Sequence, residues 1–262
     1  MQWYLLDTGT RHAAWNMAID EGLLLTCEQT RTPILRFYQW ENPTLSLGYF
    51  QSVSEISLIE CDRLGIDWIR RPTGGRAVLH ADELTYSVIA PIDTLAKSIE
   101  ASYELLSEAL ALGLTHLGLD AQLTQKHALP GEKNPVCFVT PAYAELTLRG
   151  KKIIGSAQMR TKFALLQHGS IPFTLDSEKL VRVFSLTEAQ HTRDLVKEQA
   201  AGLQDFLKCS LSVNELKRAL CKGFEQSLDA QFEPIELSES VANLACQLFV
   251  KKYSTPEWNA LR

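Results

Sequence analysis

The segment Arg70–His80 reads Arg-Arg-Pro-Thr-Gly-Gly-Arg-Ala-Val-Leu-His and directly follows an apolar stretch that ends at Ile69. Adjacent glycines allow backbone dihedral angles that other residues avoid, and they let a ligand approach the main chain closely. Arg70, Arg71 and Arg76 frame the pair, and arginine favours anionic or phosphorylated groups. The segment therefore predicts a loop that encloses a ligand, and the alternative is a basic hairpin turn with solvated arginines.

The elements next to this segment place it between two strands. Before it, a strand is predicted to end at Arg70. After it, the run Leu84–Ala90 (Leu-Thr-Tyr-Ser-Val-Ile-Ala) is apolar and rich in strand-forming residues. The pair Gly74–Gly75 therefore lies at the tip of a strand-to-strand connection and does not begin a phosphate-binding helix.

Further out, short helices and strands alternate. Ser52 and Glu55 have capping-box spacing and predict a helix before the strand that ends at Arg70. The other upstream elements are a strand at 2–7, a helix at 14–28 and strands at 34–38 and 44–48. Downstream we expect a helix through 103–117, a loop at 124–136, and strands at 143–148, 153–158 and 164–171, with a hairpin at 149–152.

Beyond about residue 176 the pattern becomes mainly helical. Ser212 and Glu215 again have capping-box spacing, and Val241, Leu244 and Leu248 recur on one face of a last helix. No Gly/Ser-rich linker or run of charge marks a boundary. We therefore expect one α+β domain over residues 1–262 with a mainly helical later part.

The composition excludes several classes of protein. Of the 262 residues, 45% are hydrophobic and 22% charged, which is typical of a globular protein with a substantial core. The formal net charge of −5 argues against a general nucleic-acid binder, because such a protein needs a large surface that neutralises phosphate. The sequence has no apolar stretch of eighteen residues and no signal-like start, so we expect a cytoplasmic protein that does not bind membranes.

The familiar metal and cofactor motifs are missing. The six cysteines include no Cys-x-x-Cys pair, which argues against a zinc site or a disulfide framework. No His-Glu-x-x-His, Gly-x-x-x-x-Gly-Lys-Ser/Thr or Gly-x-Gly-x-x-Gly motif occurs. We expect no metal and no cofactor.

Cys137 has the most distinctive surroundings of the cysteines. It lies in Asn134–Pro141 (Asn-Pro-Val-Cys-Phe-Val-Thr-Pro), where the flanking prolines exclude the middle of a helix. The thiolate is the nucleophilic form of cysteine, so a reactive cysteine needs a nearby cation, histidine or helix N-terminus. Lys152, fifteen positions later, is a candidate cation. The alternative is a half-buried structural thiol.

Three further residues carry possible chemistry. Lys152 precedes Ile153–Met159 (Ile-Ile-Gly-Ser-Ala-Gln-Met), whose small residues allow close approach of a ligand, but two lysines also suit a solvated turn. His80 and His168 follow apolar positions, and we identify no acid paired with either at a triad-like position. Satisfied histidines in the core are the common alternative.

Together, these segments resemble the lipoate/biotin protein ligase superfamily, and within it the octanoyltransferases of lipoate biosynthesis. The matching segments are Trp15–Glu21, Arg36–Trp40, Thr44–Gln51, Arg70–His80, Glu83–Ser87, Val136–Phe138, Gly150–Gln158, Leu166–Ile171 and Glu257–Asn259. They span nearly the whole chain, and their order and spacing are specific although each alone is weak. The resemblance implies an α+β catalytic domain in which mixed or antiparallel sheets pack with helices.

The resemblance also implies a site. The arginine-glycine loop and the Lys152 hairpin would enclose a medium-chain acyl group, with Cys137 and Lys152 as catalytic residues. The implied substrate-binding residues are Arg70, Arg71, Thr73, Gly74, Gly75, Arg76, His80, Gly155, Ser156, Ala157 and His168. Two departures stand out: Arg76 replaces a glycine common in the ligases, as in the octanoyltransferases, and Ala81 replaces the acid that usually follows the loop histidine.

The superfamily contains both ligases and transferases, and Cys137 favours transfer. ATP-dependent lipoate ligases typically carry an Asn-Asp pair before the lysine strand and no reactive cysteine there, whereas this chain has Val-Cys-Phe at the position of the octanoyltransferase nucleophile. The implied reaction moves octanoyl from octanoyl-acyl carrier protein through a Cys137 thioester to a lysine of a lipoyl domain, such as the glycine cleavage H protein or a 2-oxoacid dehydrogenase E2. An ATP-dependent ligase and a non-catalytic lipoyl-domain binding module are the alternatives, and we expect a monomer.

Overall fold

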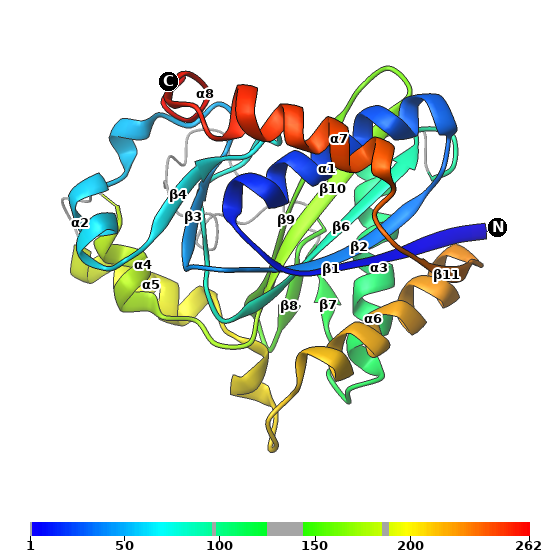
Figure 1. Cartoon of the computed structure of the whole chain (residues 1–262). Helices are drawn as coiled ribbons and strands as arrows, with labels where there is room; N and C mark the ends of the chain where they lie inside the picture. Colours follow the sequence, from blue (N-terminus) through cyan, green and yellow to red (C-terminus); the bar gives the residue numbers. More distant parts are fainter. Residues whose placement is uncertain (1, 96–97, 125–143, 185–188) are drawn as a thin grey trace.

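A computed structural model describes residues 2–95, 98–124, 144–184 and 189–262 (Figure 1). Its main sheet has eight strands in the order β11-β1-β2-β6-β10-β9-β8-β7. These strands are β1 (Gln2–Arg11), β2 (Ile34–Trp40), β6 (Glu83–Pro91), β7 (Gln122–Leu123), β8 (Leu146–Leu148), β9 (Lys151–Arg160), β10 (Ala164–Pro172) and β11 (Gln231–Ile235). Strands β11, β1 and β2 run parallel to one another, and the other pairs are antiparallel.

Helices cover both faces of this sheet. One face packs against α1 (Ala13–Thr30) and α7 (Glu239–Leu248), and the opposite face packs against α3 (Ile99–Thr115) and α6 (Val213–Leu228) (Figure 1). The central strands β6 and β10 are buried along their whole length, because they are covered on both sides. This architecture confirms the predicted α+β class with mixed and antiparallel sheets.

A second, three-stranded sheet lies beside the first and is built around the arginine-glycine segment. Its order is β4-β3-β5, with β3 (Thr44–Leu47) parallel to β4 (Asp67–Arg70) and antiparallel to β5 (Val78–His80). Apolar residues of this sheet share a core with residues of three helices, α2 (Leu58–Arg63), α4 (Ser177–Arg182) and α5 (Ala189–Gln199). The glycine pair therefore lies in a strand-to-strand connection, as predicted, but the strand that follows it is the short β5, and the expected run Leu84–Ala90 belongs to β6.

Local capping signals agree with the structure in one case and differ in another. Ser212 accepts a hydrogen bond from the Glu215 amide and begins α6 through the predicted capping box. Ser52 caps only one turn of 3₁₀-helix, Val53–Glu55, and α2 begins later, where Ser57 accepts from the Glu60 amide. The shift arises because Ile56, between the two serines, is extended and pairs with Phe184.

One strand interrupts the mainly helical later part of the chain, and one predicted loop lies largely outside the described residues. Strand β11 pairs in parallel with β1, and Phe232 packs edge-on against Trp3. Because β11 is an edge strand that contains Pro234, its own strand pattern in the sequence was weak. Residues 125–143 lie outside the described residues, so most of the predicted 124–136 loop and Cys137 are not placed.

The remaining short elements complete the chain. They are a 3₁₀ turn at Leu203–Phe206, a turn of π-helix at Phe249–Tyr253 and α8 (Pro256–Asn259). Among the described helices, none combines the length and the apolar composition needed to cross a membrane. The single-domain organisation over 1–262 stays a prediction.

Candidate functional site: a cavity between the two sheets

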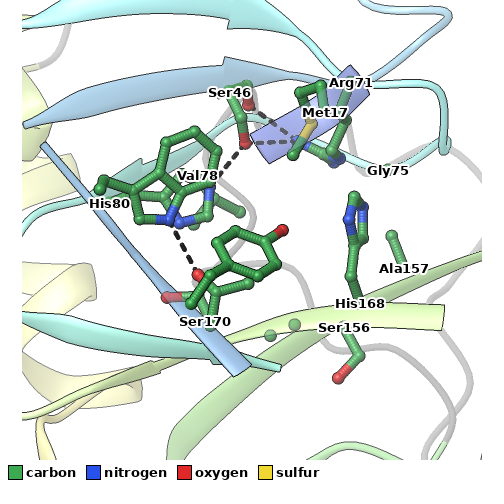
Figure 2. Close-up of a pocket in the computed structure, with 15 residues that line it drawn as sticks. Met17, Ser46, Arg71, Gly75, Val78, His80, Ser156, Ala157, His168 and Ser170 are labelled. Carbon is green, nitrogen blue, oxygen red and sulfur yellow. Dashed lines mark hydrogen bonds between the residues drawn. The ribbon is translucent and has the colours of Figure 1, made fainter. Parts of the chain in front are cut away.

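A cavity lies where α1, the small sheet and strands β6, β9 and β10 meet (Figure 2). It contains about 410 Å³ of space between atoms, part of it open to solvent. Met17, Tyr38, Trp40 and Val78 contribute apolar and aromatic walls. Of the residues predicted to bind substrate, those that line the cavity are Arg71, Gly75, His80, Gly155, Ser156, Ala157 and His168.

The loop Thr73–Gly75, called here the glycine loop, forms one wall. Gly75 has a φ of +89°, a conformation that residues with a side chain rarely adopt. The Arg71 guanidinium fastens the loop by donating hydrogen bonds to the carbonyl oxygens of Gly74 (2.7 Å), Arg76 (2.7 Å) and Ser46 (2.7 Å). The conformation of the glycine loop thus depends on a buried arginine, and Figure 2 shows Arg71 beside Gly75.

The other predicted residues of this segment have different positions. Arg70 is fully buried, with its guanidinium directed to main-chain carbonyl oxygens, and Arg76 is partly exposed and lies 3.4 Å from the Glu55 carboxylate. Thr73 is buried and contacts His168, while Gly74 borders a shallower depression next to the cavity. None of these four lines the cavity, and substrate binding stays a prediction for all eleven residues.

A buried ion pair supports the cavity from the α1 side. Asp20 and Arg36 are both fully buried, and Arg36 Nη1 lies 2.6 Å from Asp20 Oδ1. Arg36 also donates to the hydroxyl of Thr8 and to both oxygens of Asn16, the main-chain oxygen and Oδ1. Burial by itself raises the pKa of Asp20, but Arg36 and His168 outweigh burial and hold that pKa below its usual value of 3.8.

His168 connects this ion pair to the glycine loop. Its Nδ1 lies 3.2 Å from Asp20 Oδ2 and its Nε2 lies 2.7 Å from the Thr73 hydroxyl. A carboxylate only accepts hydrogen bonds, so Nδ1–H donates to Asp20 and Nε2 accepts from Thr73. Burial lowers the pKa of His168 despite Asp20, which keeps the ring neutral near pH 7.

His80 has an equivalent arrangement on the opposite wall. Its Nδ1 lies 2.9 Å from Glu83 Oε1 and its Nε2 lies 2.8 Å from the Ser46 hydroxyl. The buried Glu83 carboxylate also accepts from Trp40 Nε1 at 3.0 Å and from the hydroxyls of Thr85 and Ser170. Burial alone raises the pKa of Glu83, but His80 and the hydroxyl donors outweigh burial and lower it.

These two networks pair each histidine with an acid that the sequence pattern did not identify, and they agree with the alternative of satisfied histidines in the core. The acids come from other elements, or from a turn, and not from triad-like positions in the sequence. The sequence signal was a polar stripe in buried elements: Glu83, Thr85 and Ser87 alternate with apolar residues along β6. A polar residue on each second position of a strand with two covered faces indicates a buried network.

The polar atoms of the cavity wall are already hydrogen-bonded within the protein. All four ring nitrogens already have protein partners, and the Arg71 guanidinium is engaged with carbonyl oxygens. Figure 2 shows the Ser156 side chain directed away from the cavity, where its hydroxyl lies 2.8 Å from the Tyr86 hydroxyl. The cavity therefore offers mainly carbon surface and glycine backbone to an occupant.

Lys152 is buried next to this cavity but does not line it. Its ammonium donates a hydrogen bond to the buried Glu145 carboxylate. The register of β9 against β8 shifts by one residue at Ile153, so Lys152 lies opposite Thr147 and Ile154 lies opposite Leu146. Such a bulge changes the face to which the flanking side chains point.

This bulge decides the face of the sheet that Lys152 occupies. Leu146 and Leu148 belong to the core beneath α3 and α6, so Thr147 between them, and Lys152 opposite it, are on the other face. That face also carries His168, which lies opposite Ala157. Lys152 thus shares the cavity face of β9, whereas Cys137 lies outside the described residues.

The described residues contain no cluster of three or more histidine, cysteine, aspartate or glutamate side chains arranged to hold a metal ion. The polar side chains next to the cavity instead form hydrogen bonds with one another.

Comparisons with known proteins agree with this fold. A family model described as the lipoyl protein ligase A/B catalytic domain matches residues 12–225. The octanoyltransferase LipM of Carboxydothermus hydrogenoformans is 41% identical over 263 residues, which cover 98% of this chain and 97% of the relative. A second octanoyltransferase LipM, from Bacillus subtilis, is 37% identical over 99% of this chain and 98% of its own.

Among solved structures, the bipartite lipoate protein ligase of Thermoplasma acidophilum, studied with its E2 lipoyl domain, superposes with a TM-score of 0.85 at 31% identity. The match covers 100% of this chain and 98% of that chain. The chain belongs to the lipoyl protein ligase A/B catalytic-domain family and, within it, to the group of the LipM octanoyltransferases.

Proposed function

We propose that this protein is an acyltransferase of protein lipoylation that transfers octanoyl from octanoyl-acyl carrier protein to a lysine of a lipoyl domain. One observation of the structure carries the proposal: the polar side-chain atoms around the cavity are already bound to other protein atoms, as in the His80 and His168 networks. A straight acyl chain needs carbon contact and no hydrogen bonds, so it suits this cavity. The relatives named octanoyltransferase support the choice of acyl group.

The proposed chemistry has two steps with Cys137 as the nucleophile. In the first, the Cys137 thiolate attacks the octanoyl thioester carbonyl, a new C–S bond forms, and the old C–S bond breaks to release the carrier thiolate, which takes up a proton from water. In the second, the ε-amine of the acceptor lysine attacks the enzyme thioester, the amide C–N bond forms, and Cys137 leaves as the thiol after the amine proton is lost. Thioester exchange is nearly isoenergetic and amide formation is downhill, so the sequence of steps needs no ATP.

Lys152 is the proposed cation for the Cys137 thiolate. An ammonium near a thiol favours the thiolate and so lowers the thiol pKa. The β9 bulge puts Lys152 on the cavity face, and the Glu145 carboxylate holds the ammonium in a buried position. Backbone N–H groups near Gly75 or Gly155 are the proposed donors to the oxyanion of the tetrahedral intermediates.

The carrier protein, the acceptor identity, the monomeric state and the cytoplasmic location are parts of the same proposal. The glycine cleavage H protein and a 2-oxoacid dehydrogenase E2 are the proposed acceptors. The study of the Thermoplasma acidophilum ligase together with its E2 lipoyl domain supports an acceptor of the lipoyl-domain class. Arg76 at the partly exposed rim is the proposed contact for acidic or phosphate groups of the carrier.

Mass spectrometry after exposure to octanoyl-acyl carrier protein tests the covalent step. We expect the wild type and a Cys209→Ala control, which alters an exposed cysteine, to gain one octanoyl group, and Cys137→Ala to gain none. A Cys137→Ala variant that transfers octanoyl at the wild-type rate would rule out the thioester. A protein that binds the carrier but never gains the adduct would be a binding module.

Thiol alkylation as a function of pH tests Lys152. Burial raises the pKa of Cys27 and Cys61 to about 11 and that of Cys221 to about 12, so these thiols react little near neutral pH. In a background with Cys209 and Cys246 replaced by serine, Lys152→Ala should move the alkylation midpoint of Cys137 to higher pH. Lys151→Ala is the matched control, because Lys151 is only partly buried and its ammonium binds the Lys197 carbonyl oxygen.

ATP-dependent ligation is the second candidate, favoured by a lipoate-protein ligase A solved with ATP that is 30% identical to this chain over 99% of both chains with a TM-score of 0.85. The two activities separate in one assay with ATP, Mg²⁺ and free lipoate but no acyl carrier. A ligase would lipoylate the acceptor under these conditions, whereas the proposed transferase would not.

A further inference from the structure

Arg70 ends β4 without reaching the cavity, and its contacts give it another role. Its side chain is fully buried. Nη1 donates to the carbonyl oxygens of Gly48 (2.9 Å), Tyr49 (3.2 Å) and Gln51 (2.6 Å). Three carbonyl oxygens of one tight turn thus share a single guanidinium, which fixes the Gly48–Gln51 turn.

The Gly48–Gln51 turn also packs against the glycine loop. The Tyr49 amide donates to the Thr73 carbonyl oxygen at 2.9 Å. The backbones are so close at Gly48 that a Cβ there would lie 1.9 Å from the Gly75 carbonyl oxygen. Because Thr73 also contacts His168, the position of this turn is transmitted to two residues of the cavity wall, Gly75 and His168.

A segment far away in the sequence holds Arg70 from the other side. The Arg70 amide donates to Asn259 Oδ1 at 2.9 Å, and Arg70 Nε donates to the Asn259 carbonyl oxygen at 3.2 Å. Trp258 Nε1 donates to the Arg70 carbonyl oxygen at 2.9 Å. The segment Pro256–Arg262 therefore binds the main chain and the side chain of Arg70 together.

The same segment also reaches the turn directly and is anchored to α1. The Val53 amide donates to the Arg262 carbonyl oxygen at 2.8 Å, and the Trp258 ring lies 5.6 Å from the Tyr49 ring. The Lys252 ammonium lies 3.8 Å above the Trp258 ring and 2.8 Å from the Glu21 carboxylate. Helix α8 contacts β4, and Figure 1 shows α7 lying along α1.

We propose that the segment Pro256–Arg262, acting through Arg70, is a positioning element that sets the glycine loop for acyl-donor binding. This inference rests on the proposed octanoyl transfer. Arg70 is then a positioning residue and not an acyl ligand, and Trp258 and Asn259 are the residues through which the segment acts. Loosening the segment lets the Gly48–Gln51 turn and the glycine loop move, which weakens donor capture before it affects the chemical step.

Two variants of the segment and one control test the proposal. Asn259→Ala removes the side-chain oxygen that accepts a hydrogen bond from the Arg70 amide. Trp258→Phe keeps an aromatic ring but loses the Nε1–H donor to the Arg70 carbonyl oxygen. Glu257→Gln, on the exposed side of the same short helix, is the control. Steady-state transfer from octanoyl-acyl carrier protein is measured together with hydrogen–deuterium exchange of the peptide that contains Tyr49 and Gln51.

We expect the KM for the octanoyl donor to rise about tenfold in Asn259→Ala and in Trp258→Phe, which corresponds to ~1.4 kcal/mol. The value of kcat should stay near that of the wild type, exchange of the turn should become faster, and Glu257→Gln should behave as the wild type. A role in global stability alone would lower the active fraction, and so kcat, without changing KM, and this result would overturn the proposal. Unchanged KM and unchanged exchange in both variants would overturn it too.

The exchange measurement keeps this test separate from the proposed function. If the wild type transfers no octanoyl group, the proposed function fails. Hydrogen–deuterium exchange in the Gly48–Gln51 turn then tests by itself whether the segment Pro256–Arg262 holds the turn in place. Faster exchange in both variants supports the positioning element, and unchanged exchange refutes it.

Discussion

A methyl group at Gly48 is predicted to damage acyl transfer more than it damages the fold. The Cβ of Gly48→Ala would lie 1.9 Å from the Gly75 carbonyl oxygen, and Cβ contacts under 3.0 Å are essentially never found. One of the two backbones must therefore move by at least about 1.1 Å. Gly75 is a wall of the cavity and has a positive φ, so the glycine loop cannot absorb this movement without changing the cavity.

The magnitude follows from the size of this displacement. Overpacking of this kind costs about 1–3 kcal/mol of stability, and a misplacement of ~1 Å near a reacting group can cost roughly 100-fold in rate. We expect urea unfolding of Gly48→Ala, followed by tryptophan fluorescence, to show a cooperative protein that is less stable by that amount. We expect kcat/KM for octanoyl transfer to fall by about 10- to 100-fold at a temperature where the variant is folded.

A matched glycine provides the control for this variant. A Cβ at Gly22, inside α1, would have its nearest neighbours at 3.6 Å, an ordinary contact. Gly22→Ala should therefore leave transfer unchanged and stabilise the protein by roughly 0.4–1 kcal/mol. A folded Gly48→Ala with wild-type kcat/KM would refute the reasoning, because it would mean that the glycine loop can move by about 1 Å without consequence.

Three other predictions concern the buried Asp20–Arg36 ion pair, the buried titratable groups and the cavity wall. Arg36→Met leaves the Asp20 carboxylate buried without its cation and should lower the free energy of unfolding by about 3–5 kcal/mol, measured by urea unfolding, while the double variant that adds Asp20→Asn should lose less. Stability should fall as the pH decreases, because the lowered pKa of His168 contributes stability that is lost below about pH 6.5, and the lowered pKa values of Asp20 and Glu83 contribute stability that is lost below about pH 4. His168→Gln should therefore flatten the pH dependence of the free energy of unfolding between pH 7 and pH 5, and an equal slope in both proteins would contradict this. Ala157→Leu places three more carbons in the cavity wall and should lower kcat/KM for octanoyl by at least roughly tenfold while a butanoyl donor is less affected, and an equal loss for both chain lengths would contradict the acyl cavity.

The order of most elements could be predicted from local patterns. The strand that ends at Arg70, the helix α1 and the strands β6, β9 and β10 follow from periodicity and turn residues, which act over a few residues of the chain. The strand β11 and the start of α2 could not, because pairing with β1 and the extended backbone at Ile56 decide them. Those contacts bring together residues that are distant in sequence.

The sequence by itself determined the family, the reactive candidates Cys137 and Lys152, and seven residues that line the cavity, because family motifs and small residues are local features of the chain. Only the tertiary structure decided how His80 and His168 are paired with Glu83 and Asp20. Asp20 is 148 positions from His168, and Glu83, although three positions from His80, meets it only because of the turn between β5 and β6. The tertiary structure also gave Arg70 its place between the Gly48–Gln51 turn and Asn259. The physical reason is that a buried charged group takes whichever partners the packed elements bring within hydrogen-bond distance, and 189 positions of sequence separate Arg70 from Asn259.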